Sequence, residues 1–107
     1  MARMLVVLML CTLGRVACAD VQHTSKSIGA LMGPDDTRDC TFFTLQGVSQ
    51  TDPNVASEWF AIPRIHQGFK EITALLLAAK VSGIPINVTT NGQTVCGHAG
   101  IRSVVMP

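Results

Sequence analysis

Tyrosine is absent from this chain, tryptophan occurs once, and charged side chains make up only 14% of the 107 residues. Eight of them are Lys or Arg and seven are Asp or Glu, and the basic residues do not cluster. Proteins that bind single-stranded nucleic acid need a basic groove with stacking aromatic side chains. The composition therefore argues against a nucleic-acid partner.

The chain also lacks an apolar run of the roughly 20 residues that a membrane-spanning helix needs. Its longest run, Met4–Leu13, is apolar apart from one threonine, follows Arg3 and precedes the small-x-small triplet Ala17–Ala19. This arrangement is typical of a secretory signal peptide. We therefore predict that residues 1–19 are a signal peptide and that the mature chain begins at Asp20.

Two alternatives to cleavage remain open. The segment could stay attached as an anchor, or Cys18 could be acylated as in a lipoprotein. Arg15 is unusual in a cleavage region, and lipoprotein signals carry an apolar residue at that place. With the leader cleaved after Ala19, we expect a secreted or periplasmic protein without membrane attachment.

Cleavage would leave one domain, residues 20–107, with Cys40 and Cys96 as its two cysteines. A domain of this size buries a core only marginally, and exported proteins can add disulfides. A Cys40–Cys96 disulfide would close a loop of more than 50 residues, worth roughly 4 kcal/mol in the chain-entropy model. Two free thiols fit export less well, and a two-cysteine metal site lacks the close spacing of metal motifs.

One amphipathic helix is predicted in the second half of the chain, where apolar residues recur at steps of three and four. These apolar positions are Ile65, Phe69, Ile72, Leu76 and Ala79. We expect Lys70, Glu71 and Lys80 on the solvent face. Gly83 can adopt the left-handed C-cap conformation and Pro85 cannot continue the helix, so the helix should end there.

Five strands are predicted from runs of β-branched and aromatic residues and from period-two alternation. They are Ser25–Met32, Cys40–Leu45, Trp59–Ile62, the stretch that begins at Ile84, and Ile101–Met106. Asn91-Gly92 is a hairpin signal, and Gly47–Glu58 reads as a long loop.

The predicted fold is mainly β with one helix, in the order β-β-β-α-β-β. This is the order of the OB-fold, a five-stranded, partly open Greek-key barrel. A simpler α+β layer, with a helix packed on an antiparallel sheet, is the alternative.

No catalytic, cofactor or metal motif is recognisable. The three histidines, His23, His66 and His98, lack ligand spacing, and no serine lies in a nucleophile-elbow pattern. The acidic cluster from Asp35 to Asp39 lacks the spacing of a calcium loop and is typical of a turn. We predict a non-enzymatic protein without a cofactor.

Trp59 is the residue with the clearest functional option, because an exposed tryptophan can stack on a sugar ring. The loop before it offers Asp52, Asn54 and Ser57 as hydrogen-bonding groups. The alternative is that Trp59 belongs to the core. In a strand, Trp59 and Ala61 would then share one face and Phe60 the other.

Several segments together resemble a known family. CTFFTLQGVSQTDPNV, WFAIP, KEITALLLAAKVSGIPINV and CGHAGIRSVVM look like small secreted bacterial proteins related to the binding subunit of subtilase cytotoxin and to pertussis-like toxin B subunits. The resemblance covers Cys40–Met106 and implies an OB-like barrel, a disulfide and export. In the toxin members it also implies a ring of five subunits that binds sialylated glycans.

Two functions follow from these observations. The first is a secreted, non-enzymatic glycan-binding module similar to a toxin B subunit, with a homo-oligomer as its form. The second is a periplasmic or secreted accessory protein that binds a protein partner, for which an open sheet edge would serve.

Overall fold

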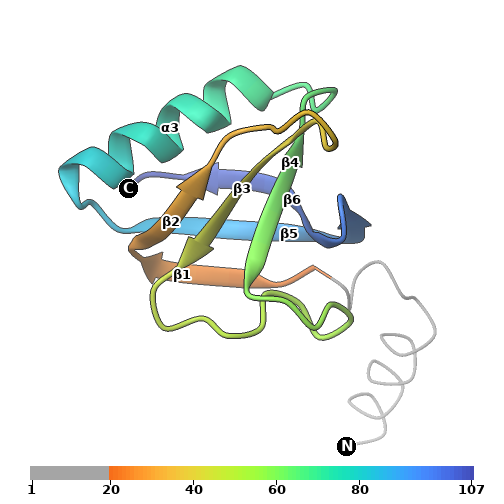
Figure 1. Ribbon diagram of the computed structural model, residues 1–107. Coiled ribbons are helices and arrows are strands. Elements are labelled where there is room, and N and C mark those ends of the chain that lie inside the picture. Colours follow the sequence, from red (N-terminus) through yellow and green to blue (C-terminus); the bar gives the residue numbers. More distant parts are fainter. Residues whose placement is uncertain (1–19) are drawn as a thin grey trace, which may run out of the picture.

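The computed structural model describes residues 20–107, and the predicted signal peptide, residues 1–19, lies outside the described residues. Six strands form one sheet, and one helix packs against it (Figure 1). The elements are β1 (Gln22–Lys26), β2 (Ile28–Met32), β3 (Cys40–Leu45), β4 (Trp59–Pro63), α3 (Phe69–Ser82), β5 (Ile86–Val95) and β6 (His98–Val105). The prediction of a mainly β fold with one helix is confirmed.

The sheet is open and mixed, with the strand order β1-β5-β6-β4-β3-β2. Every neighbouring pair is antiparallel except β4 and β6, which run parallel. The predicted five-stranded, partly open barrel is therefore not confirmed, because the hydrogen-bonded sheet is open and has six strands. The alternative of a helix on an antiparallel sheet is wrong at the parallel pair of β4 and β6.

The extra strand arises where the first predicted strand, Ser25–Met32, divides in two. Ser25 has a φ of 56°, in the left-handed region, and its N–H donates to the Asn87 side chain at 2.8 Å. Such a backbone interrupts an extended strand. The chain therefore pairs with β5 before Ser27 and with β3 after it.

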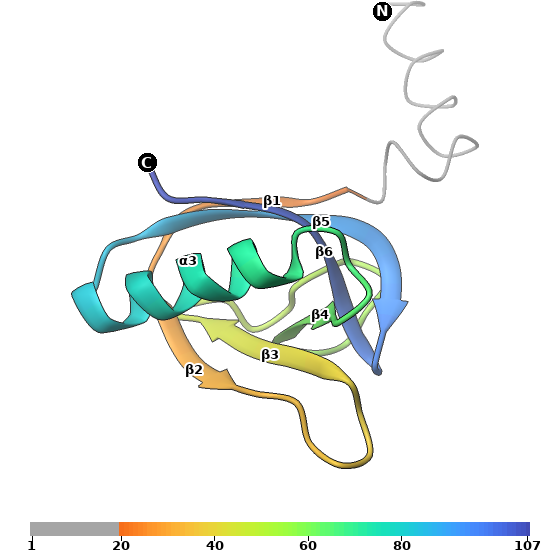
Figure 2. The same cartoon turned by 90° about the horizontal axis from the view of Figure 1, so that it is seen from above.

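Residues of α3 and of the strands together form the main core, and Figure 2 shows α3 lying over the sheet in the view from above. Phe43 of β3 and Phe60 of β4 stack with ring centroids 4.9 Å apart, and both are fully buried. Leu76 carries the helix into this cluster and is also fully buried. Burying a side chain of this size contributes about 1.5–3 kcal/mol, so these contacts fix the helix on the sheet.

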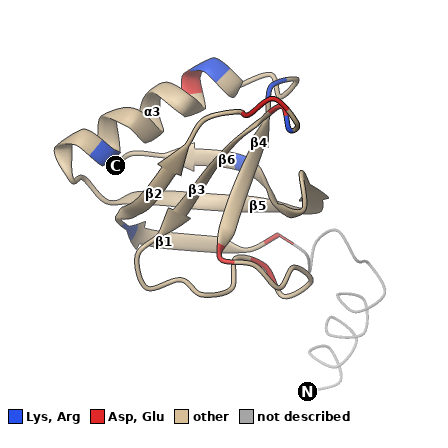
Figure 3. Cartoon of the chain, in the orientation of Figure 1, with Lys and Arg blue, Asp and Glu red and all other residues tan. Residues whose placement is uncertain are grey.

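The predicted end of the helix is confirmed. Gly83 has a φ of 71°, and its N–H donates to the Ala79 carbonyl at 2.8 Å. The predicted positions of Lys70, Glu71 and Lys80 on the solvent face are confirmed. Leu77 and Val81 are exposed as well, at 57% and 80%. Ile65, expected in the core, is 91% exposed and lies before the helix. Figure 3 shows that the charges of α3 sit near its two ends.

The hairpin between β5 and β6 turns at Cys96-Gly97 rather than at the predicted Asn91-Gly92. Val95 pairs with His98 across a two-residue turn, and the two turn residues have φ values of 51° and 82°. Positive φ at both central positions defines the type I′ turn that matches strand twist. Asn91-Gly92 instead lies within β5, where the register shifts, so the glycine serves an irregularity of the strand.

The predicted Cys40–Cys96 disulfide is confirmed, and it joins the start of β3 to the β5–β6 turn. A second apolar cluster surrounds it. Its members are Cys40, Phe42 and Ala61, with Trp59, Val95 and Cys96 packed at the edge. The expected alternation in β4 is confirmed, because Phe60 belongs to the main core while Trp59 and Ala61 belong to this disulfide cluster.

The acidic segment before β3 forms a turn. Asp35 Oδ1 accepts hydrogen bonds from Thr37 N, Thr37 Oγ1 and Arg38 N, at 2.7–2.8 Å. These bonds, with the Thr37 hydroxyl the strongest, lower the pKa of Asp35 to about 2. Within residues 20–107, no group of three acidic, histidine or cysteine side chains is placed to hold a metal ion.

Candidate functional site

Two buried polar side chains, Thr51 and Thr90, hold the long loop between β3 and β4, residues 46–58, in place. Thr51 Oγ1 donates to the Ser57 carbonyl at 3.0 Å, and this bond ties the two arms of the loop together. Thr90 Oγ1 of β5 donates to Asp52 Oδ2 at 3.1 Å. His23 Nε2 of β1 lies 2.8 Å from the Thr51 carbonyl. The loop is thus attached to β1 and β5 rather than free.

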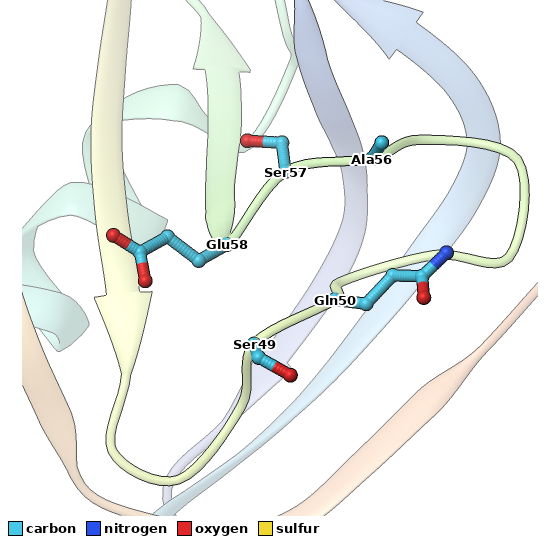
Figure 4. A pocket seen from close by; sticks show the side chains of 5 residues that line it. All are labelled: Ser49, Gln50, Ala56, Ser57 and Glu58. Atoms are coloured by element: carbon cyan, nitrogen blue, oxygen red, sulfur yellow. The ribbon is translucent and has the colours of Figure 1, made fainter.

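A solvent-open pocket of about 460 Å³ lies between the two arms of this loop. Its lining residues are Ser49, Gln50, Ala56, Ser57 and Glu58. Figure 4 shows Ser49 and Gln50 on one arm, and the other three on the arm that leads into β4. We call this site the loop pocket.

Hydrogen-bond acceptors dominate the polar groups of the loop pocket. Gln50 Nε2 donates to the carbonyls of Asp52 and Pro53, at 3.2 and 3.4 Å, which leaves its Oε1 as the group that can meet a ligand. Glu58 is exposed and contributes a carboxylate, which when ionised only accepts. A ligand that donates hydrogen bonds therefore suits this pocket.

Ser57 lies between the loop pocket and the sheet. Its Oγ accepts the Trp59 N–H at 3.0 Å and lies 2.7 Å from His98 Nδ1 of β6. The loop arm is thereby joined to β6 by a side-chain contact. Two of the hydroxyl's hydrogen-bonding positions are already used within the protein.

His98 is half-buried beside the disulfide cluster. Its ring meets the edge of Phe42 at a centroid distance of 5.5 Å, and Arg38 lies over the same phenyl ring at 4.5 Å. Burial, and secondarily the positive charge of Arg38, lower the pKa of His98 below its usual 6.5. The imidazole next to Ser57 is therefore neutral near pH 7.

The charge around the loop pocket is negative. Glu58 is the one ionisable side chain among its five lining residues. The sequence has no Lys or Arg between Arg38 and Arg64, and that stretch includes Asp52. Figure 3 shows red segments at the loop end of β4 and in the loop. Arg38 precedes β3 and Arg64 follows β4, so both lie at the ends of these strands that are away from the loop. The pocket is therefore poorly suited to an anion.

The four predicted ligand residues are separated by the structure. Ser57 lines the loop pocket. Asp52 is buried and serves as an anchor of the loop, and Asn54 is exposed but lies outside the pocket lining. Trp59 is half-buried against the disulfide cluster, in agreement with its alternative assignment to the core.

Sequence reasoning missed Ser49, Gln50 and Glu58. The available signal was their position, because each lies on an arm of the loop close to the strand it connects, where a bound ligand would meet a fixed backbone. The predicted ligand residues Asp52 and Asn54 belong instead to the Asp-Pro-Asn segment at the loop tip.

A second hollow of about 400 Å³ lies beside the start of α3. Two of its polar groups already have partners within the protein. Arg64 Nε donates to Asp39 Oδ1 at 2.6 Å, and His66 Nδ1 accepts the Gly68 N–H at 2.9 Å. Lys70 and Glu71 also line this hollow, so it carries charges of both signs and lacks the acceptor character of the loop pocket.

Comparison with known families and with curated proteins gives no match to this chain. Within residues 20–107, no helix combines the length and the hydropathy that crossing a membrane would require. The geometry of the loop pocket is therefore the main evidence for a function.

Proposed function

We propose that this protein is a secreted or periplasmic, non-enzymatic binding module that recognises glycans through the loop pocket. The observation that carries the proposal is the set of hydroxyl, amide and carboxylate groups that line one loop, which side-chain hydrogen bonds hold in place. Sugars are recognised by several such hydrogen bonds at once. A loop already held in place loses little conformational entropy on binding.

The fold supports an OB-like assignment in finer detail. β1 and β2 are the two outer strands of the sheet, yet only Ser27 separates them in sequence. One long first strand with a break at Ser27 would therefore serve both edges of a barrel. The helix follows the third long strand, as in the OB-fold. This arrangement agrees with the resemblance to toxin B subunits, from which the glycan function and a ring of subunits are inferred.

The proposed location is supported by the disulfide, since such bonds persist in oxidising compartments. Intact-mass measurement of the exported protein should give a chain that begins at Asp20 and lacks two hydrogens. A retained leader or two alkylatable thiols would contradict this location.

A glycan array probed with oxidised protein, residues 20–107, tests the glycan function. We expect saturable binding to one class of glycan, reversed by the same glycan in free form. The array should be repeated at high protein concentration, because multivalent lectins bind weakly at each site. Silence across the array under both conditions would refute the proposal.

The second candidate, an accessory protein that binds a protein partner, is favoured by the outer face of α3. Leu77 and Val81 are exposed there with no charged residue between them except Lys80, which reaches back to the Gly29 carbonyl. A second copy of the chain is one such partner. Light scattering should then give a mass above one chain, and Val81→Lys should lower it.

A further inference from the structure

We infer that the loop pocket selects a neutral, hydroxyl-rich sugar and rejects acidic sugars, with Glu58 as the residue that sets this preference. The inference rests on the proposed glycan function and adds the chemical class of the ligand. It differs from what the family resemblance implies, since the related toxins bind sialylated glycans.

The free polar atoms of Gln50 and Glu58 accept hydrogen bonds. The amide N–H groups of Gln50 donate to the carbonyls of Asp52 and Pro53, so Oε1 is its free atom. The Glu58 carboxylate can accept several hydrogen bonds and donates none when ionised. Sugar hydroxyls supply the matching donors, and neighbouring hydroxyls can share one carboxylate.

The negative charge of the loop pocket disfavours an acidic sugar. A sialylated sugar carries a carboxylate, and its recognition needs a cation or several free N–H donors. The five lining residues include no Lys, Arg or His, and Glu58 adds a negative charge. Two like charges about 4 Å apart weaken binding by about five-fold even at the dielectric constant of water, and by more in a partly dehydrated site.

Ser57 is the remaining strong polar group on the arm of the loop that leads into β4. Its Oγ already accepts the Trp59 N–H and contacts His98 Nδ1. It is therefore a poor candidate for neutralising a ligand carboxylate. Ser49, exposed on the opposite arm, can donate one hydrogen bond, which does not balance the charge of Glu58.

The loop that carries the pocket is held rigidly. The Thr51–Ser57 bond and the Thr90–Asp52 bond hold the two arms of the loop in place. A basic side chain from elsewhere would have to enter the pocket to reverse its charge. Arg38 precedes β3 and Arg64 follows β4, at the ends of these strands away from the loop, and they form ion pairs with Asp35 and Asp39 respectively.

The test compares one branched glycan in two forms, with and without its terminal sialic acids, against three versions of the oxidised protein. The versions are the unchanged chain, Glu58→Gln and Glu71→Gln. Glu71 is an exposed glutamate on α3 outside the loop pocket, so its variant matches the change in net charge. Glu58→Gln keeps the shape of an exposed side chain, so the fold should be retained, as circular dichroism can verify.

We expect the unchanged chain and Glu71→Gln to prefer the desialylated form by at least about five-fold. Glu58→Gln should bind that form roughly ten-fold more weakly, the typical effect of losing a charge-assisted hydrogen bond, and should discriminate less between the two forms.

The possible failures are distinct. Equal or tighter binding of the sialylated form by the unchanged chain would overturn the inference and leave the glycan function standing. A preference for the neutral form that Glu58→Gln does not alter would remove Glu58 and the loop pocket from the inference. No binding of either form, together with silence across the full array, would refute the glycan function itself.

Discussion

At the scale of single residues, His98 links the loop pocket to the stability of the fold. Burial and the nearby Arg38 lower its pKa from 6.5, so the unfolded chain binds a proton more readily than the folded one. Where the unfolded state holds more protons, the free energy of unfolding rises with pH. The stability is therefore complete above pH 6.5 and decreases as the pH falls from there through the lower pKa of the folded state.

The variant His98→Asn isolates this effect, because asparagine keeps a polar atom near the place of Nδ1 without titrating. We expect the stability advantage of the unchanged protein over this variant to shrink as the pH falls below 6.5. Urea unfolding at several pH values measures it, and other titrating groups cancel in the difference. An advantage that stays constant or grows in acid would contradict the lowered pKa.

Asp52 shows why the residues of the site were only partly predictable. An Asp-Pro-Asn sequence in a long loop is typical of an exposed turn, and exposure made Asp52 a candidate ligand residue. In the structure it is 2% exposed, and its two carboxylate oxygens accept bonds from Asn54 N and Thr90 Oγ1. The partner that buries it is 38 residues away, and no local pattern indicates such a distant bond.

At the scale of elements, α3 offers a direct comparison of two adjacent leucines. Leu76 is fully buried in the main core, while Leu77 is 57% exposed. Leu76→Ala should lower the free energy of unfolding by about 2–5 kcal/mol, because it leaves a cavity that the core fills only in part. Leu77→Ala should change it by less than about 1 kcal/mol, as is usual for exposed positions.

Urea denaturation of both variants with the disulfide intact would give the two values. Similar losses for the two leucines would mean that the outer face of α3 is also covered, and would favour the second candidate function. The period of the apolar residues predicted which side of the helix faces the sheet. It did not predict the exposed apolar residues on the opposite side. Leu77 and Val81 match neither the spacing of the core positions nor the polar residues expected at a surface.

Turn signals were reliable where one residue alone must adopt a left-handed backbone. Gly83 ended the helix as predicted because no side chain hinders its φ of 71°. Asn91-Gly92 was assigned the hairpin turn, yet the chain places the turn at Cys96-Gly97. The disulfide partner Cys40 lies at the start of β3, so pairing and the cross-link together select the later turn.

At the scale of the whole molecule, a mainly β fold with one helix was predictable, but the sixth strand and the pairing of the open sheet were not. Pairing of β1 with β5 and of β2 with β3 depends on the break between Ser25 and Ile28. Serine has no marked preference for a left-handed backbone, so nothing local announces the break. The Asn87 side chain that accepts the Ser25 N–H comes from a strand 62 residues later.

The disulfide is the feature whose loss should affect the whole molecule. Cys40 and Cys96 are 56 residues apart, so their bond restricts most of the unfolded chain. In the chain-entropy model its removal lowers the free energy of unfolding by about 4 kcal/mol. A domain of this length is typically stable by about 4–13 kcal/mol, so the loss takes a large part of the total.

The double variant Cys40→Ala/Cys96→Ala and the unchanged protein in reducing buffer should both unfold at much lower urea concentration than the oxidised protein. Reducing agent should leave the double variant unaffected, which separates loss of the bond from other effects of the buffer. In both the reduced and the oxidised protein, Leu76→Ala should lower the free energy of unfolding more than Leu77→Ala, because the main core lies apart from the disulfide cluster. An unchanged midpoint on reduction would mean that the core and the pinned loop alone hold the fold, and that the disulfide serves another purpose than stability.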